Sequence, residues 1–178
     1  MDDSISKFVN AIPFFKEFNE HEKNKMISRS NCFVKFSKDE EVFKQGDQGD
    51  SLYVVLHGII GLYRFGSINS VDDDTKISLQ KDVEKRVKDI KTGGVFGEIA
   101  MLTSKNRSVT ARVTSPQAVL MKISKTLMES LNPAAQIKFH KQLLLSLAGH
   151  LDKMNSLFVD MEFKYESLVS KGLKGNGK

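Results

Sequence analysis

The residues with the clearest chemical potential lie in one short stretch, GVFGEIAMLTSKNRS, from residue 94 to residue 108. Gly97 precedes an apolar segment that is able to form one or two helical turns starting near Glu98. The first turn of a helix has unbonded backbone N–H groups and the positive end of the helix dipole, which together attract an anion. Glycine at position 97 would let a ligand approach that backbone closely.

Two charged side chains belong to the same stretch. Arg107 can hold an anion through a bidentate contact. A carboxylate such as Glu98 is unsuited to a phosphate but can accept a hydrogen bond from a ribose hydroxyl. Free backbone N–H groups at a helix start, an arginine and a carboxylate therefore indicate a binding site for a sugar phosphate. From residue types alone, a helix-start charge and an ordinary surface cation remain the simpler interpretation.

The elements that must position these residues follow from the hydrophobic pattern. Residues 5–29 have helical spacing interrupted by Pro13, which predicts two short helical pieces around a turn. Residues 32–123 are short apolar runs punctuated by glycine, which predicts many short strands and favours a sandwich or barrel. Two of these runs, on either side of His57-Gly58, are predicted to form a tight hairpin.

The polar residues 66–84 are predicted to form a long loop or a hairpin extension. Asp72, Asp73 and Asp74 lie within it and are interpreted as a solvated loop tip. A cation site is the less favoured reading because no glycine-anchored calcium-loop spacing accompanies the three aspartates.

The last third of the chain is predicted to be helical, with Ser124 capping one helix and Asn132-Pro133 starting the next. A coiled-coil seam follows in alternating steps of three and four: Ile137, His140, Leu144, Leu147, Leu151, Met154, Phe158, Met161, Tyr165 and Leu168. A helix over 134–170 would be about 55 Å long, so we expect a parallel homodimer through it. Packing of the seam within the chain is the alternative. Gly149 is interpreted either as a close-packing position or as a bend.

Three sequence motifs resemble those of cyclic nucleotide-binding domains. FGEIAML followed by NRSVT resembles the family's phosphate-binding cassette, and GDQGDSLYVVLHG at 46–58 resembles its first β-hairpin signature. The helical start with IPFF at 12–15 is also similar, and the resemblance covers roughly residues 8–155. It implies an α+β fold, an antiparallel β-roll or jelly-roll barrel with N-terminal helices and a long C-terminal helix.

The resemblance also implies roles for individual residues. Glu98 would bind the ribose 2′-hydroxyl, and Arg107 would pair with the cyclic phosphate. The remaining implied ligand-binding residues complete the phosphate and base contacts or line the pocket: Gly97, Ile99, Ala100, Ser108, Val95, Phe96 and Asn155. Val109 replaces the small alanine common in the family, and it could crowd the pocket.

The nucleotide is expected to be cAMP, with cGMP as the second possibility. A hydroxyl at position 108 can bond the 2-amino group of a syn guanine, and family members that prefer cGMP often have threonine there. Serine, present here as Ser108, also occurs in members similar to the bacterial catabolite activator, which use cAMP.

The implied function is a regulatory, non-enzymatic sensor that rearranges its C-terminal helices and signals to an unknown downstream protein. The alternatives are a degenerate, non-binding dimerisation scaffold and the sensor fragment of a larger transcription factor or enzyme. Direct DNA binding is not expected, because only about ten residues follow Leu168. A net charge of +5, a single cysteine and no long apolar run predict a cytoplasmic protein with no metal and no membrane contact.

These interpretations divide the chain into four parts. Residues 1–31 form an N-terminal helical segment, and residues 32–123 form the nucleotide-binding β-roll with its cassette at 94–108. Residues 124–170 form C-terminal helices that include the dimerisation coiled coil. Residues 171–178 form a flexible basic tail.

Overall fold

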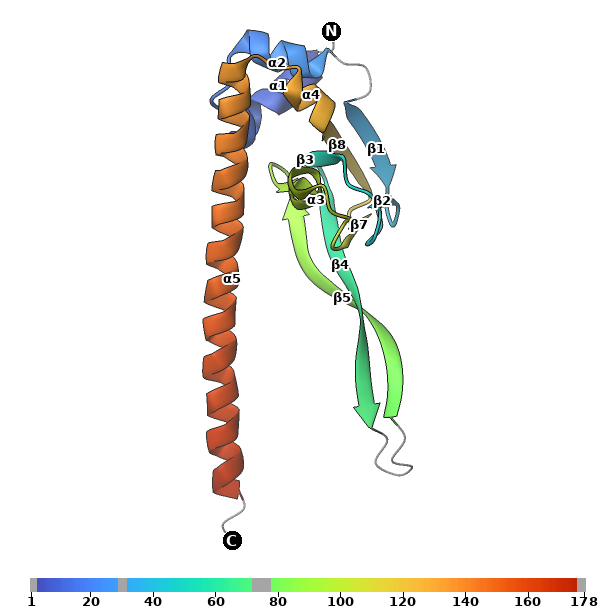
Figure 1. The fold of residues 1–178 in the computed structure, drawn as a ribbon, viewed down its shortest axis with the longest axis vertical. Coiled ribbons are helices and arrows are strands. Elements are labelled where there is room, and N and C mark those ends of the chain that lie inside the picture. The colour runs from blue at the N-terminus through green and yellow to red at the C-terminus, as the bar shows by residue number, and fades with distance from the viewer. Residues whose placement is uncertain (1–2, 29–31, 72–77, 176–178) are drawn as a thin grey trace. The chain divides into compact units, whose positions relative to one another are not determined.

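The structure, a computed structural model, describes residues 3–28, 32–71 and 78–175 and divides into two compact units. The first unit, Met1–Lys138, contains the N-terminal helices and all the described strands (Figure 1). The second unit, Phe139–Lys178, is formed by most of the long helix α5. The predicted site residues up to 108 therefore belong to the first unit.

The N-terminal segment forms two helices around a turn, as predicted. Helix α1 (Asp3–Ala11) is followed by the 3-10 helix η1 (Pro13–Phe15) and helix α2 (Glu20–Ile27). Asn19 begins α2 through a capping box with Glu22, which satisfies two backbone N–H groups of the helix start.

The strands form two antiparallel sheets of four strands each, with the order β1-β8-β3-β6 in one and β2-β7-β4-β5 in the other. Their bounds are β1 Phe33–Ser37, β2 Glu41–Phe43, β3 Ser51–His57, β4 Ile59–Val71, β5 Ser78–Lys91, β6 Val95–Phe96, β7 Thr110–Val113 and β8 Gln117–Ser124. Both sheets contribute buried side chains to one core cluster, which includes Val55 and Leu120 from the first sheet and Ile60 and Val113 from the second. This is the predicted α+β architecture built on antiparallel strands.

The hairpin predicted through His57-Gly58 is wrong. Strand β3 is hydrogen-bonded to β8 on one edge and to β6 on the other, so no edge is left for β4. Strand β4 pairs instead with β5 and β7 in the second sheet. The chain therefore crosses between the sheets at Gly58, and both sheets need an apolar face there, which explains the continuous apolar run on either side.

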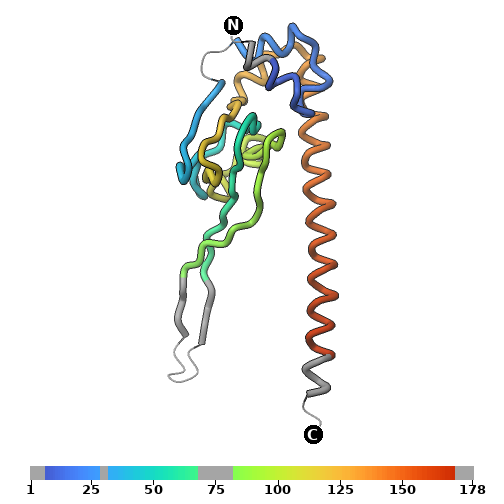
Figure 2. Tube along the Cα trace, turned by 180° about the vertical axis from the view of Figure 1, so that it is seen from behind, coloured from blue at the N-terminus to red at the C-terminus, as the bar shows by residue number. Residues whose placement is uncertain are grey.

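Strands β4 and β5 extend beyond the rest of their sheet as a two-stranded ribbon (Figures 1 and 2). β4 pairs with β5 from Ile59 to Val71, but its pairing with β7 ends at Tyr63. Beyond that point the side-chain amide of Gln45 bonds to the backbone N–H and carbonyl of Phe65, at 2.8 Å and 3.3 Å. This confirms the hairpin extension predicted at 66–84, and the three aspartates at 72–74 lie outside the described residues.

Three further helices follow the pattern read from the sequence. Helix α3 (Glu98–Thr103) starts at the predicted residue, and helix α4 (Lys125–Glu129) is capped by Ser124, whose hydroxyl accepts from the backbone N–H of Leu127 at 3.1 Å. Helix α5 (Pro133–Gly175) begins with Asn132 as its cap, and its 43 residues make it about 65 Å long.

Helix α5 continues without interruption through Gly149, where an added Cβ would meet no atom within 4 Å. Most of the predicted seam is exposed in the single chain: Leu144, Leu151, Met154, Phe158, Met161, Tyr165 and Leu168 are each at least 56% exposed. Burying so many large apolar side chains on one helix face requires another surface. None of the helices within the described residues is long and apolar enough to cross a membrane.

Candidate functional site

The cassette folds as a strand, a turn and a short helix. Strand β6 ends at Phe96, Gly97 adopts a left-handed conformation with φ of +79°, and α3 begins at Glu98. A positive φ favours glycine because it has no Cβ. Helix α3 buries Ala100 and leaves Ile99 half exposed to solvent.

The other end of the cassette is fixed by the loop that precedes β3. The backbone N–H of Arg107 donates to the carbonyl of Asp47, and the N–H of Gly46 donates to the carbonyl of Arg107, both at 2.8 Å. Gln48 and Asn106 form an isolated bridge beside these bonds. The loop and the cassette therefore hold the backbone of Arg107 in a defined place.

The side chain of Arg107 is buried, at 5% exposure, and is held between two backbone carbonyls. Nη1 donates to the carbonyl of Gly97 at 2.6 Å and Nη2 to that of Ser51 at 2.7 Å, while the guanidinium lies 4.2 Å from the ring centre of Phe43. Its buried Nε has no hydrogen-bond partner among the residues that the structure describes. Among the described side chains no carboxylate forms a salt bridge with Arg107. A buried cation with an unmatched donor fits an anionic ligand.

An aromatic cluster supports this arginine from below. Phe96 stacks on Tyr53 with ring centres 5.4 Å apart and contacts Phe43 at 5.8 Å. Both partners also lie under the Arg107 guanidinium, Tyr53 at 5.9 Å. The structure thus places Phe96 in the core cluster next to the arginine, and Val95, its neighbour on β6, is also buried. Cation–π attraction helps to hold the guanidinium in this position.

Glu98 is buried at 4% exposure, which is unusual for a carboxylate. Burial raises its pKa above the ordinary value, and its own backbone N–H, Lys88 and Arg107 partly oppose that rise. A carboxylate held in a low-dielectric site beside a cation is able to accept a hydrogen bond from a ligand hydroxyl that stays clear of bulk water.

The raised pKa of Glu98 has a consequence for stability. Between the ordinary pKa of Glu98 and its raised pKa in the folded protein, the folded state keeps a proton that the unfolded chain has released, so stability falls as pH rises through that interval, by at most about 1.4 kcal/mol per pH unit. Glu98→Gln is expected to remove this loss. Urea unfolding of both proteins from about pH 4 to about pH 8 should show the variant gaining relative stability as pH rises above the ordinary glutamate pKa. A constant difference across that range would contradict the burial argument.

Gly49 is a site residue that sequence reasoning did not single out. A Cβ at this position would lie 2.4 Å from the Cβ of Ala100 and 3.0 Å from the guanidinium carbon of Arg107. The cassette helix and the arginine therefore pack directly on the backbone at Gly49. The glycine was visible within the GDQGD motif, but the contact that requires it comes from tertiary structure.

Gly49→Ala is expected to destabilise the fold by about 1–3 kcal/mol, because Ala100 and Arg107 must both move. Gly66→Ala is the matched control, since a Cβ at Gly66 would meet no atom within 4 Å. Urea unfolding should separate the two variants clearly. Equal stabilities would show that the packing around Gly49 is loose.

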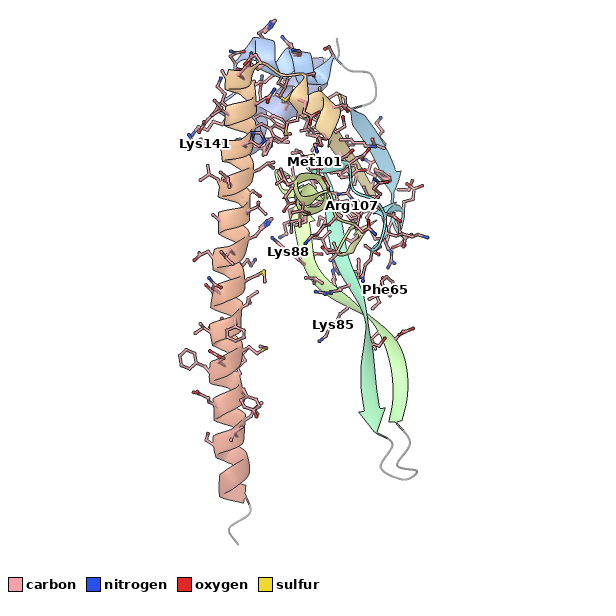
Figure 3. The ribbon with its side chains drawn as sticks, viewed as in Figure 1. Phe65, Lys85, Lys88, Met101, Arg107 and Lys141 are labelled. Carbon is pink, nitrogen blue, oxygen red and sulfur yellow. The ribbon has the colours of Figure 1, made fainter. Side chains whose placement is uncertain are left out.

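Lys88 is the second residue that was missed. It lies on β5 opposite Leu62 of β4, two residues before the buried Ile90, so its half-buried side chain shares the inner face of the sheet. Figure 3 shows it on β5 close to α3. Burial is the main influence on the Glu98 pKa and raises it, and the positive charge of Lys88 partly opposes that rise. Residues two apart on a strand face the same side, so the apolar Ile90 was the sequence signal that Lys88 also faces inward.

The sequence of the first unit matches a known family over most of its length. The family model described as "cyclic nucleotide-binding domain" matches residues 33–132. This chain belongs to the cyclic nucleotide-binding domain family.

Relatives and solved structures agree with this assignment. The chain is 28% identical over 105 residues to a cAMP-dependent protein kinase regulatory subunit of Emericella nidulans, covering 59% of this chain and 21% of that protein. It is 32% identical over 119 residues to a cGMP-dependent protein kinase of Plasmodium berghei, covering 65% of this chain and 12% of that protein. A cyclic nucleotide-binding domain from Methylobacillus flagellatus shares the fold, with a TM-score of 0.66, 18% identity, and coverage of 87% of this chain and 80% of that one. The chain therefore spans about a fifth or less of the length of these two curated relatives.

Within this cyclic nucleotide-binding domain, the first unit brings together Gly97, Glu98, Ala100 and Arg107. Ser108 is exposed next to the arginine, and Val109 packs against the core cluster. Asn155 is exposed on α5 in the second unit, so its implied base contact stays a prediction. No group of three histidine, cysteine or acidic side chains suited to a metal ion occurs in the described part of the chain.

Proposed function

We propose that this domain is a sensor that binds a purine cyclic nucleotide at Glu98 and Arg107 and transmits the response through α5 to a partner protein. The observation that carries the proposal is Arg107, a buried cation with an unpartnered Nε and no carboxylate salt bridge among the described side chains. A phosphate oxygen at Nε would satisfy this donor and supply the missing negative charge.

The roles of the site residues follow the chemistry of such a ligand. Arg107 and the backbone N–H groups around Gly97, Ile99 and Ala100 would hold the cyclic phosphate, while Glu98 would accept from the ribose 2′-hydroxyl. The Ser108 hydroxyl would bond the base or phosphate. cAMP is the ligand favoured by the resemblance to the catabolite activator, and cGMP is the second candidate.

The response is proposed to leave the domain through a dimer of α5. The exposed seam from Leu144 to Leu168 repeats over more than three heptads, which fits a second copy of the same helix. Nucleotide binding would shift the helix arrangement by as much as the ligand prefers one arrangement over another. A downstream protein would then read that arrangement.

A non-binding dimerisation scaffold is the second candidate function, and one observation favours it. Arg107 already bonds two backbone carbonyls and stacks on Phe43, so it contributes to the fold without any ligand. A purely structural arginine would still leave its Nε without a partner and Glu98 buried at a cost, which weakens this alternative.

Calorimetric titration of the full chain with cAMP and with cGMP tests the proposal, with 5′-AMP as the control that lacks the cyclic phosphate. Saturable binding of at least one cyclic nucleotide, and much weaker binding of 5′-AMP, is the expected result. If neither cyclic nucleotide binds at millimolar concentration, the sensor function is wrong and the non-binding scaffold is the function that remains.

A further inference from the structure

We propose that Phe43 is a positioning residue of the candidate site, which sets the plane of the Arg107 guanidinium and thereby the direction of its Nε donor. This role rests on the proposed function, because Phe43 would act on the nucleotide only through the arginine. Phe43 lies on β2, outside the cassette, and none of the sequence motifs assigns it a part in binding.

Two backbone carbonyls hold the ends of the guanidinium but do not fix its plane. Nη1 of Arg107 donates to the carbonyl of Gly97 at 2.6 Å, and Nη2 donates to that of Ser51 at 2.7 Å. These two bonds fix the line through the two nitrogens, and the flat group is still able to turn about that line as far as its flexible side chain allows. A contact against the face of the planar group limits this rotation.

The ring of Phe43 supplies this contact. Its centre lies 4.2 Å from the guanidinium carbon of Arg107, whereas the ring centre of Tyr53 lies 5.9 Å from it. Phe43 is itself held in place, because it is only 8% exposed and its ring packs against Tyr53 and Phe96 at 5.9 Å and 5.8 Å. A Cβ at Gly97 would lie 3.4 Å from the Phe43 ring and 2.8 Å from Nη1 of Arg107. The turn at Gly97, the ring and the guanidinium therefore pack as one unit.

The orientation of the plane decides where the donor for a ligand points. The Nε–H bond lies in the guanidinium plane, and Nε has no hydrogen-bond partner in the described part of the chain. A donor that is already oriented spares a phosphate oxygen the cost of ordering the arginine side chain. The negative face of the Phe43 ring also attracts the cation, which forms no salt bridge with a carboxylate among the described side chains.

Fluorination of the Phe43 ring tests this contact while the shape of the side chain stays almost unchanged. Fluorine withdraws electrons, so pentafluorophenylalanine has lost the negative face that attracts a cation. The full chain with pentafluorophenylalanine in place of Phe43 should bind cAMP and cGMP about two- to thirtyfold more weakly than wild type, as measured by calorimetric titration. The same replacement of Phe36 is the matched control, since Phe36 of β1 packs against the same core cluster and has no cation–π contact with Arg107 among the described residues. The control should bind as wild type does.

A double-mutant cycle separates positioning of the arginine from a general loosening of the core. Phe43→Leu should weaken binding in the wild-type background but cause little further loss in the Arg107→Ala background, because the group that the ring positions is then absent. Urea unfolding of each protein shows that it is folded under the titration conditions. A purely structural role of Phe43 would instead lower affinity by the same factor in both backgrounds.

Unchanged affinity of the protein fluorinated at Phe43 would overturn the positioning role, and so would an equal loss of affinity on fluorination of Phe36. Full additivity of Phe43→Leu and Arg107→Ala would also overturn it. In each of these cases the binding of cyclic nucleotides by wild type, and with it the sensor function, would stand. Failure of both cAMP and cGMP to bind wild type would instead remove the proposed function and the role of Phe43 together.

Discussion

Replacing Arg107 with alanine is expected to weaken cyclic nucleotide binding by at least about ten- to hundredfold, as for loss of a hydrogen bond to a charged group. The reason is that Arg107 is the buried cation of the candidate site and its Nε has no hydrogen-bond partner within the described part of the chain. Calorimetric titration of the variant against wild type measures the loss directly.

The design must separate binding from folding, because Arg107 also donates to the carbonyls of Gly97 and Ser51. Urea unfolding should therefore show some destabilisation of Arg107→Ala, and circular dichroism must show that it remains folded. Arg107→Lys keeps the charge but loses the planar fork, so it should bind with intermediate affinity. Arg112→Ala is the control: this arginine of β7 pairs with Glu41 and Glu84, and its loss should leave binding unchanged. Full affinity in a folded Arg107→Ala protein would refute the site assignment.

The second large effect is expected at the α5 seam. Leu151→Asp combined with Phe158→Asp should convert the proposed α5 dimer to a monomer, because each substitution places a carboxylate in the apolar seam of both helices. Both residues are more than half exposed in the single chain, so the fold of the first unit should survive the change. Light scattering coupled to size-exclusion chromatography gives the molar mass of each protein.

Val159→Asp is the matched control for this experiment. Val159 is also an exposed apolar residue of the same helix, at 45%, but it falls outside the alternating steps of the seam. The control should therefore remain dimeric. A monomeric wild type, or monomers from Val159→Asp as readily as from the double variant, would show that the heptad pattern does not define the interface.

Local signals predicted the helical elements well. Pro13, Ser124 and Asn132 each lie at the start of a helix in the structure. Pro13 is the first residue of η1, and the side chains of Ser124 and Asn132 cap α4 and α5. The cassette helix likewise begins at Glu98, directly after the left-handed Gly97. Such signals depend on residues three or four apart, so they can be recognised without knowing the tertiary structure.

Strand partners were less accessible, because pairing is decided by competition among all the strands. The apolar run around His57-Gly58 fits a hairpin and a crossing between sheets equally well. The pairing of β3 with both β6 and β8 decides for the crossing, because it leaves no free edge for β4. Gly49 and Lys88 were missed for the same reason. Gly49 matters because Ala100 and Arg107 pack on it, and Lys88 matters because its charge acts on Glu98, and these partners are distant in sequence from Gly49 or lie on another element.

The side-chain amide of Gln45 bonds to β4 close to the point where β4 stops pairing with β7 and continues paired with β5 alone. Before Tyr63, β4 lies between β5 and β7, so it is hydrogen-bonded to a strand on each side. Beyond Phe65, the described residues of β4 pair with β5 and with no third strand, and a two-stranded ribbon is marginally stable by itself. The ribbon is therefore able to open while the candidate site stays folded, and amide hydrogens on either side of this boundary should exchange with solvent on different timescales.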